Sequence, residues 1–169
     1  DHRDLHSFPT RRSSDLLGQF YHISIDNDIP YNVYGGMQDN GSWKGPSRIY
    51  QRGGIRNSHW QELLFGDGFD VSPHPKDSRF GYAMYQGGNV HKYNTETGRA
   101  QYIQPVSTDS SLMLRFNWNA GLAQDPFDDC TVYFGSQFVH KSTNCGDSWE
   151  VISPDLTTND TTKDRKSVV

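Results

Sequence analysis

The feature that most constrains the fold is a segment that occurs three times along the 169-residue chain. The copies begin at Tyr31, Arg79 and Cys130 and read YNVYGGMQDNGSWKG, RFGYAMYQGGNVHKYN and CTVYFGSQFVHKSTNCGDSW. Each copy has a tyrosine followed four residues later by a glutamine, and the aligned pairs are Tyr34 with Gln38, Tyr82 with Gln86, and Tyr133 with Gln137. The copies are 48 and then 51 residues apart. Such a spacing indicates one supersecondary unit used three times.

The repeated unit has the local pattern of β-structure. Short segments of alternating β-branched, aromatic and polar residues lie between turn residues, and no segment has sustained helical periodicity. Asn40-Gly41 in the first copy and Gly87-Gly88 in the second supply the positive φ that a tight hairpin requires. The 16 glycines, 8 prolines, 9 tyrosines and 9 phenylalanines are typical of a turn-rich β protein. We therefore expect almost no helix.

The length of the repeat predicts the architecture. One four-stranded blade of a β-propeller takes about 40–50 residues, so we expect an all-β fragment of a β-propeller, with three blades in an open ring. The blades should span residues 17–65, 66–105 and 106–163. Their strands are expected at 19–25, 31–37, 42–46 and 60–64, then 68–72, 80–85, 89–94 and 99–104, then 113–119, 131–136, 138–142 and 148–153. A β-sandwich is the alternative, but three equal quartets of strands disfavour it.

The two ends of the chain, residues 1–16 and 164–169, are expected to be non-native. Residues 10–16 read TRRSSDL, which the string ACACGACGCTCTTCCGATCT can encode. Residues 164–169 read DRKSVV, which GATCGGAAGAGCGTCGTG can encode. The second string is the reverse complement of a stretch of the first, so both ends resemble translated sequencing adapter. The alternative is a natural basic arm.

Charge and composition limit the partners. A net charge of −4 argues against nucleic acid as the main partner. The longest apolar run is only a few residues, which predicts no membrane span in this fragment. Two cysteines exclude a disulfide-dense miniprotein and a cysteine-only zinc site. His74, His91 and His140 lack ligand spacing, so we expect no metal, and no other cofactor is indicated.

Residues 142–149 read STNCGDSW and resemble the Asp-box, Ser-x-Asp-x-Gly-x-Ser/Thr-Trp, of bacterial-neuraminidase-type repeats. The residues that match the motif are Ser142, Asn144, Gly146, Ser148 and Trp149, with Asn144 in place of the usual aspartate. Asn144 should accept backbone N–H groups inside the turn. Gly146 should adopt a conformation that a side chain forbids, and Trp149 should pack between sheets. The motif is structural, so it indicates fold and not activity.

A wider resemblance covers nearly all of residues 18–160. Its segments are GQFYHISID, VYGGMQDNGSW, FGDGFDVSPHP, YQGGNVHKYNTETG, LRFNWNA and SWEVISPDLTTND. They are similar to sortilin-like and glycosyl-hydrolase-like Asp-box propellers, which include many bacterial secreted proteins. The resemblance implies an extracellular or periplasmic location, further blades in the full-length chain, and a carbohydrate or polypeptide ligand at the channel mouth. A glycoside hydrolase acting on polysaccharide and a purely structural scaffold are the alternatives.

Propeller topology places several polar residues at the mouth of the channel. Asn40, Gln86 and Gln137 come from loops on this face and are candidate ligand-binding residues. Asp39 and Asp67 are two carboxylates from adjacent blades on the same face, as glycoside hydrolysis requires. Xyloglucanase-like Asp-box propellers have a similar arrangement. The alternative is that both aspartates are turn residues that bond to their own backbone.

Arg115 and Trp118 lie on the expected innermost strand at 113–119. Arg115 would suit an anionic ligand, although one arginine falls short of the cluster that sialidases use. Trp118 would suit stacking on a sugar ring. The alternatives are a salt bridge in the channel wall for Arg115 and core packing for Trp118.

The two cysteines flank one hairpin. Counting outward from a turn near 136–137 places Cys130 opposite residues 143–144, one step from Cys145. A small loop adjustment would bring the thiols within disulfide reach. We therefore expect a disulfide in an exported protein. Two unrelated small residues are the alternative.

Overall fold

The computed structural model describes residues 18–159, which form three four-stranded antiparallel sheets and one short 3-10 helix. The first sheet contains β1 (Phe20–Ile25), β2 (Asn32–Met37), β3 (Gly41–Pro46) and β4 (Gln61–Leu64). The second contains β5 (Gly68–Pro73), β6 (Phe80–Tyr85), β7 (Asn89–Asn94) and β8 (Arg99–Tyr102). The third contains β9 (Leu122–Gln124), β10 (Val132–Gly135), β11 (Val139–Ser142) and β12 (Glu150–Val151). The terminal segments 1–16 and 164–169 lie outside the described residues.

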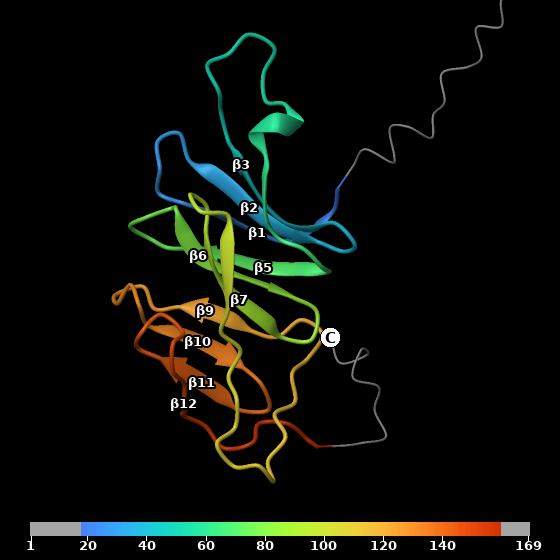
Figure 1. Ribbon diagram of the computed structural model, residues 1–169, viewed down its shortest axis with the longest axis vertical. Coiled ribbons are helices and arrows are strands. Elements are labelled where there is room, and N and C mark those ends of the chain that lie inside the picture. The colour runs from blue at the N-terminus through green and yellow to red at the C-terminus, as the bar shows by residue number, and fades with distance from the viewer. Residues whose placement is uncertain (1–17, 160–169) are drawn as a thin grey trace, which may run out of the picture.

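The three sheets follow one another along the long axis of the molecule in chain order, as Figure 1 shows. In each sheet the strands are adjacent in the order in which they occur in the sequence. The first strands are neighbours, because β1 contacts β5 and β5 contacts β9. The prediction of an all-β chain in three four-stranded units is confirmed, and the sheets do not close on themselves in the part described.

The connection between β3 and β4 is long and carries the 3-10 helix Asn57–His59. It extends beyond the sheets at the top of Figure 1.

The first strand of the third sheet is not where the sequence predicts it. It spans Leu122–Gln124 and not residues 113–119. In the predicted segment the N–H of Arg115 donates to the side chain of Gln137, not to a strand ladder. Phe116 and Trp118 pack against the core from this irregular segment. The alternating apolar residues in 113–119 are therefore explained by packing of Phe116 and Trp118 against the core, and not by a β-strand.

The connection between the first and second strands has the same geometry in all three sheets. The N–H of its first residue donates to a carbonyl six residues later, from Asp26 to Asn32, from His74 to Phe80, and from Asp125 to Thr131. The side chain of that first residue also accepts N–H groups inside the loop. Because the Nδ1 atom of histidine is an acceptor, His74 replaces the two aspartates in this role.

Two clusters of buried side chains join the sheets. The first and second sheets share Tyr34, Val71, Ala83 and Tyr93. The second and third sheets share Phe69, Tyr82, Met84, Val90, Ile103, Ala120, Val132 and Phe134, against which Trp149 packs. The main hydrophobic contribution to stability therefore lies between sheets and not within any one of them.

Two glycines set the distance between the first and second sheets. A Cβ atom added at Gly36 on β2 would lie 2.2 Å from the carbonyl carbon of Gly68 on β5. The neighbouring backbone N of Phe69 would lie 2.3 Å away. Backbone therefore packs directly on backbone at this point, and no side chain fits between the sheets.

Candidate functional site

Asp39 and Asp67, the candidate catalytic pair, meet where the first and second sheets adjoin. The carboxylate of Asp67 accepts the main-chain N–H of Asp39 at 2.9 Å. Asp39 has a φ of 59°, and an N–H in such a turn needs an acceptor. The N–H of Asp67 in turn donates to Oε1 of Gln86 at 2.8 Å. The structure thus brings Asp39, Asp67 and Gln86 together, and Asp67 fixes the β2–β3 turn through its carboxylate.

Asn40 lies in the same turn. Its side-chain amide donates to the carbonyl of Gln38 at 3.1 Å, and its own carbonyl accepts the indole N–H of Trp43. Both bonds are made within residues 38–43, so Asn40 shapes the hairpin between β2 and β3.

The structure places Gln137 in the interior. Its side chain is fully buried, its Oε1 atom accepts the N–H of Arg115 at 2.7 Å, and its amide donates to the carbonyl of Met113 at 2.9 Å. Gln137 therefore anchors the segment before β9, as Gln86 anchors the segment before β5.

Arg115 and Trp118 also have protein partners. The guanidinium of Arg115 lies 2.8 Å from the carboxylate of Asp155 and 2.9 Å from the hydroxyl of Thr157. The contact with Asp155 agrees with the alternative prediction for Arg115, a salt bridge within the protein in place of a bound anionic ligand. Trp118 is half-buried and packs against the core between the second and third sheets.

The turn after β11 is held by a compact set of side-chain bonds. Ser142 Oγ accepts the N–H of Gly146 at 2.8 Å and donates to Oδ1 of Asn144 at 2.9 Å. The same Asn144 oxygen accepts the N–H of Ser148 at 2.9 Å. Gly146 has a φ of 86°. The turn is therefore fixed by short polar side chains and by one residue that tolerates positive φ.

This turn is tied to its own sheet and to the second sheet. Cys145 forms a disulfide with Cys130, with a Cα–Cα distance of 4.3 Å, and its N–H donates to the carbonyl of Cys130. The indole N–H of Trp149 donates to the carbonyl of Ile103 at 2.7 Å. Trp149 therefore connects the third sheet to the segment that follows β8.

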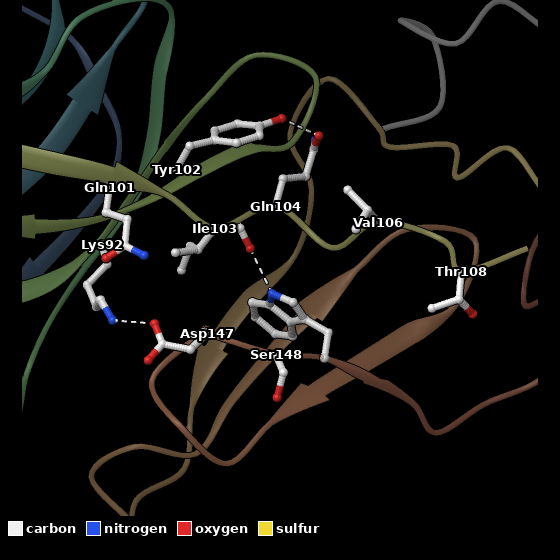
Figure 2. A pocket seen from close by; sticks show the side chains of 11 residues that line it. Lys92, Gln101, Tyr102, Ile103, Gln104, Val106, Thr108, Asp147 and Ser148 are labelled. Atoms are coloured by element: carbon white, nitrogen blue, oxygen red, sulfur yellow. Dashed lines mark hydrogen bonds and ion pairs between the residues drawn. The ribbon is translucent and has the colours of Figure 1, made fainter. Parts of the chain in front are cut away.

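A groove of about 740 Å³ lies beside this turn, between the second and third sheets. Gln101, Tyr102 and Gln104 line it from the second sheet, and Asp147, Ser148 and Trp149 line it from the third. Figure 2 shows Gln101, Tyr102 and Gln104 on one side of the group and Asp147 and Ser148 on the other. This groove could not be predicted from the sequence, because its walls come from segments about 45 residues apart that only inter-sheet packing brings together.

The groove combines an aromatic ring with hydrogen-bonding groups. The Tyr102 side chain is 48 % exposed, and its hydroxyl donates to Oε1 of Gln104. Partial burial raises the pKa of Tyr102, with a smaller contribution from Tyr85, so the phenol stays neutral. Lys92 and Asp147 form an ion pair of 2.9 Å at one side of the groove, as Figure 2 shows. Their charges compensate each other, which favours a neutral polar ligand over an ion.

Two further observations concern residues 18–159. None of their His, Cys, Asp and Glu side chains form a group of three or more that could hold a metal ion. No helix in this part of the chain has the length and apolar character to cross a membrane. In comparisons with known proteins, the sequence matches no family model and no curated protein.

Proposed function

We propose that this chain is part of an extracellular or periplasmic protein of the β-propeller class, and that it binds carbohydrate in the groove between Tyr102 and Trp149. The repeat length and the three sheets in series support the propeller class. The disulfide between Cys130 and Cys145 supports export, because such bonds persist in oxidising compartments.

The observation that carries the ligand class is the exposed ring of Tyr102 beside amide and hydroxyl groups. An aromatic ring offers a flat apolar surface for the C–H face of a sugar, while its hydroxyl stays hydrated. Gln101 and Ser148 offer hydrogen-bonding groups for sugar hydroxyls, while Gln104 is held by bonds to the carbonyls of Gly87 and Gly88 and positions the Tyr102 hydroxyl. A volume of about 740 Å³ lies within the range of small-molecule sites, about 300–1,000 Å³.

The test is titration of the chain against a panel of soluble polysaccharides by affinity electrophoresis and calorimetry. We expect Tyr102→Ala to weaken binding about tenfold, which is about 1.4 kcal/mol. Tyr31→Ala is the matched control, since Tyr31 is 46 % exposed and lies outside the groove. Equal binding by the two variants would contradict the proposal, and so would retention of the chain on peptide arrays with none on polysaccharides.

A glycoside hydrolase acting through Asp39 and Asp67 is the second candidate, because the Asp67 carboxylate lies 2.9 Å from the main-chain N of Asp39 and the two residues therefore share one edge of the molecule. Asp67→Asn is an informative variant, because the asparagine oxygen still accepts the N–H of Asp39 while the charge is lost. If the pair is catalytic, Asp39→Asn and Asp67→Asn abolish release of reducing sugar and leave the thermal unfolding temperature nearly unchanged. Absence of hydrolysis by the unmodified chain on every polysaccharide that it binds would exclude this candidate.

A further inference from the structure

One glutamine on the wall of the groove has an equivalent in the first sheet. Both glutamines lie on the last strand of their sheet and opposite a lysine. Gln61 on β4 is the cross-strand partner of Lys44, and Gln101 on β8 is the cross-strand partner of Lys92. Each lysine in turn lies opposite the repeated tyrosine of its sheet. The two glutamines therefore occupy the same position of the repeat, and their surroundings can be compared directly.

In the first sheet this glutamine is bonded to the sheet that follows. Nε2 of Gln61 donates to the carbonyl of Thr95, in the turn after β7, at 2.9 Å. Nζ of Lys44 donates to the carbonyl of Ser78 at 3.2 Å. Gln61 is half-buried in this position. Both side chains therefore connect the first sheet to the second.

In the second sheet the lysine makes this connection without the glutamine. Lys92 bonds to Asp147, in the turn after β11, at 2.9 Å. The carbonyl equivalent to that of Thr95 belongs to Asn144, because each follows by three residues a lysine opposite the repeated tyrosine, Lys92 or Lys141. This carbonyl accepts the N–H of Asp147 at 3.3 Å. The turn after β11 therefore uses for itself the acceptor that the glutamine of the first interface takes.

The amide of Gln101 is consequently free in the groove. The side chain is exposed, and neither its oxygen nor its nitrogen has a hydrogen-bond partner within residues 18–159. It lies beside the ion pair of Lys92 and Asp147, as Figure 2 shows. A ligand can therefore bond to this amide without displacing a hydrogen bond of the fold.

We propose that, given carbohydrate binding in this groove as proposed above, Gln101 determines its specificity and selects neutral saccharides with free hydroxyls on adjacent ring carbons. A glutamine amide carries an acceptor at Oε1 and donors at Nε2, side by side. One hydroxyl of the sugar would donate to Oε1 while its neighbour accepts from Nε2. Methylation of these hydroxyls removes the donor and adds bulk, so Gln101 would discriminate against the methylated sugar.

The experiment measures the binding of two probes by calorimetry. The first is cellohexaose, in which the internal glucose units carry free hydroxyls on adjacent ring carbons, and the second is cellohexaose with these hydroxyls methylated. The unmodified chain should bind cellohexaose about tenfold more tightly than the methylated form. Gln101→Ala should bind cellohexaose about tenfold more weakly than the unmodified chain does, and should bind the two probes equally.

Gln61→Ala is the matched control, since it removes the same residue from the same position of the first interface. This variant should bind both probes like the unmodified chain, and its thermal unfolding temperature should fall by about 2–4 °C because a bond between sheets is lost. Gln101→Ala should unfold at the temperature of the unmodified chain. A decrease in unfolding temperature for Gln101→Ala as large as that for Gln61→Ala would overturn the proposal, because the amide would then belong to the fold.

The binding data separate this proposal from the proposed function. Binding of cellohexaose that Tyr102→Ala weakens and Gln101→Ala leaves unchanged would overturn the role of Gln101 alone. Discrimination against the methylated probe by Gln101→Ala would do the same. So would a chain that binds another polysaccharide through Tyr102 but does not bind cellohexaose. Failure of the unmodified chain to bind any saccharide would overturn the proposed function, and the role of Gln101 with it.

Discussion

At the scale of single residues, His140 is the titratable group with the least access to water in the core of the third sheet. It is 2 % exposed, and its Nε2 atom lies 2.7 Å from the hydroxyl of Ser136. The ring packs against Phe116 and Phe138. Burial in these surroundings lowers the pKa of His140 from its ordinary value of 6.5, because the charged imidazolium loses hydration.

This burial predicts that acid weakens the fold before the carboxylates titrate. Below about pH 6.5 the unfolded chain binds a proton at His140 that the folded chain does not, so the free energy of unfolding falls with pH. We expect His140→Gln to reduce the loss of stability between about pH 7.5 and about pH 5.5 in urea unfolding. His91, whose pKa is also lowered by burial, accounts for part of the remaining slope. An identical pH dependence for the variant and the unmodified chain would contradict this.

For several polar residues the sequence predicted the position in the fold but not the function of the side chain. Residue type and topology placed Asp39, Asp67 and Gln86 at one edge, and they do meet there. The sequence does not show which atoms of these residues form hydrogen bonds. In the structure, the Asp67 carboxylate and the Gln86 amide oxygen each accept a main-chain N–H. Gln137 shows the same limit, because a residue predicted to bind ligand at the channel mouth is buried, with the oxygen and the nitrogen of its amide both bonded to main-chain groups.

At the scale of elements, the hairpins were predictable and one strand was not. Gly-rich turns beside short alternating segments define β2 with β3 and β6 with β7 within a residue or two. Leu122–Gln124 is short and lacks β-branched residues, whereas residues 113–119 have the stronger strand pattern. Tertiary packing of Phe116 and Trp118 decides against that pattern, as it commonly does in short segments.

The close contact between β2 and β5 gives a prediction at this scale. Gly36→Ala should lower the free energy of unfolding by about 1–3 kcal/mol, because the new methyl group meets backbone that cannot move aside. Gly121→Ala is the control, since a Cβ atom there has no neighbour within 4 Å. The measurement is urea unfolding of both variants. Equal stability of the two would mean that the first and second sheets are farther apart than described.

At the scale of the whole molecule, one interface explains the arrangement of the three sheets. Tyr34 of the first sheet and Tyr82 of the second sheet each pack against the sheet that follows. The groove lies at the second of these interfaces. The repeat of Tyr34, Tyr82 and Tyr133 was visible in the sequence. The spacing of the repeat does not show which face of each sheet packs against the next one. The sequence therefore could not predict that Tyr34 and Tyr82 point toward the sheet that follows.

The most direct test of this repeated interface is a nuclear Overhauser spectrum of the isotopically labelled chain. The ring protons of Tyr34 should show cross-peaks to the methyl groups of Val71 or Ala83, and those of Tyr82 should show cross-peaks to the core of the third sheet that contains Val132. Both sets of cross-peaks are the predicted result. Tyrosine rings that show contacts only within their own sheets would contradict the stacking, and with it the groove.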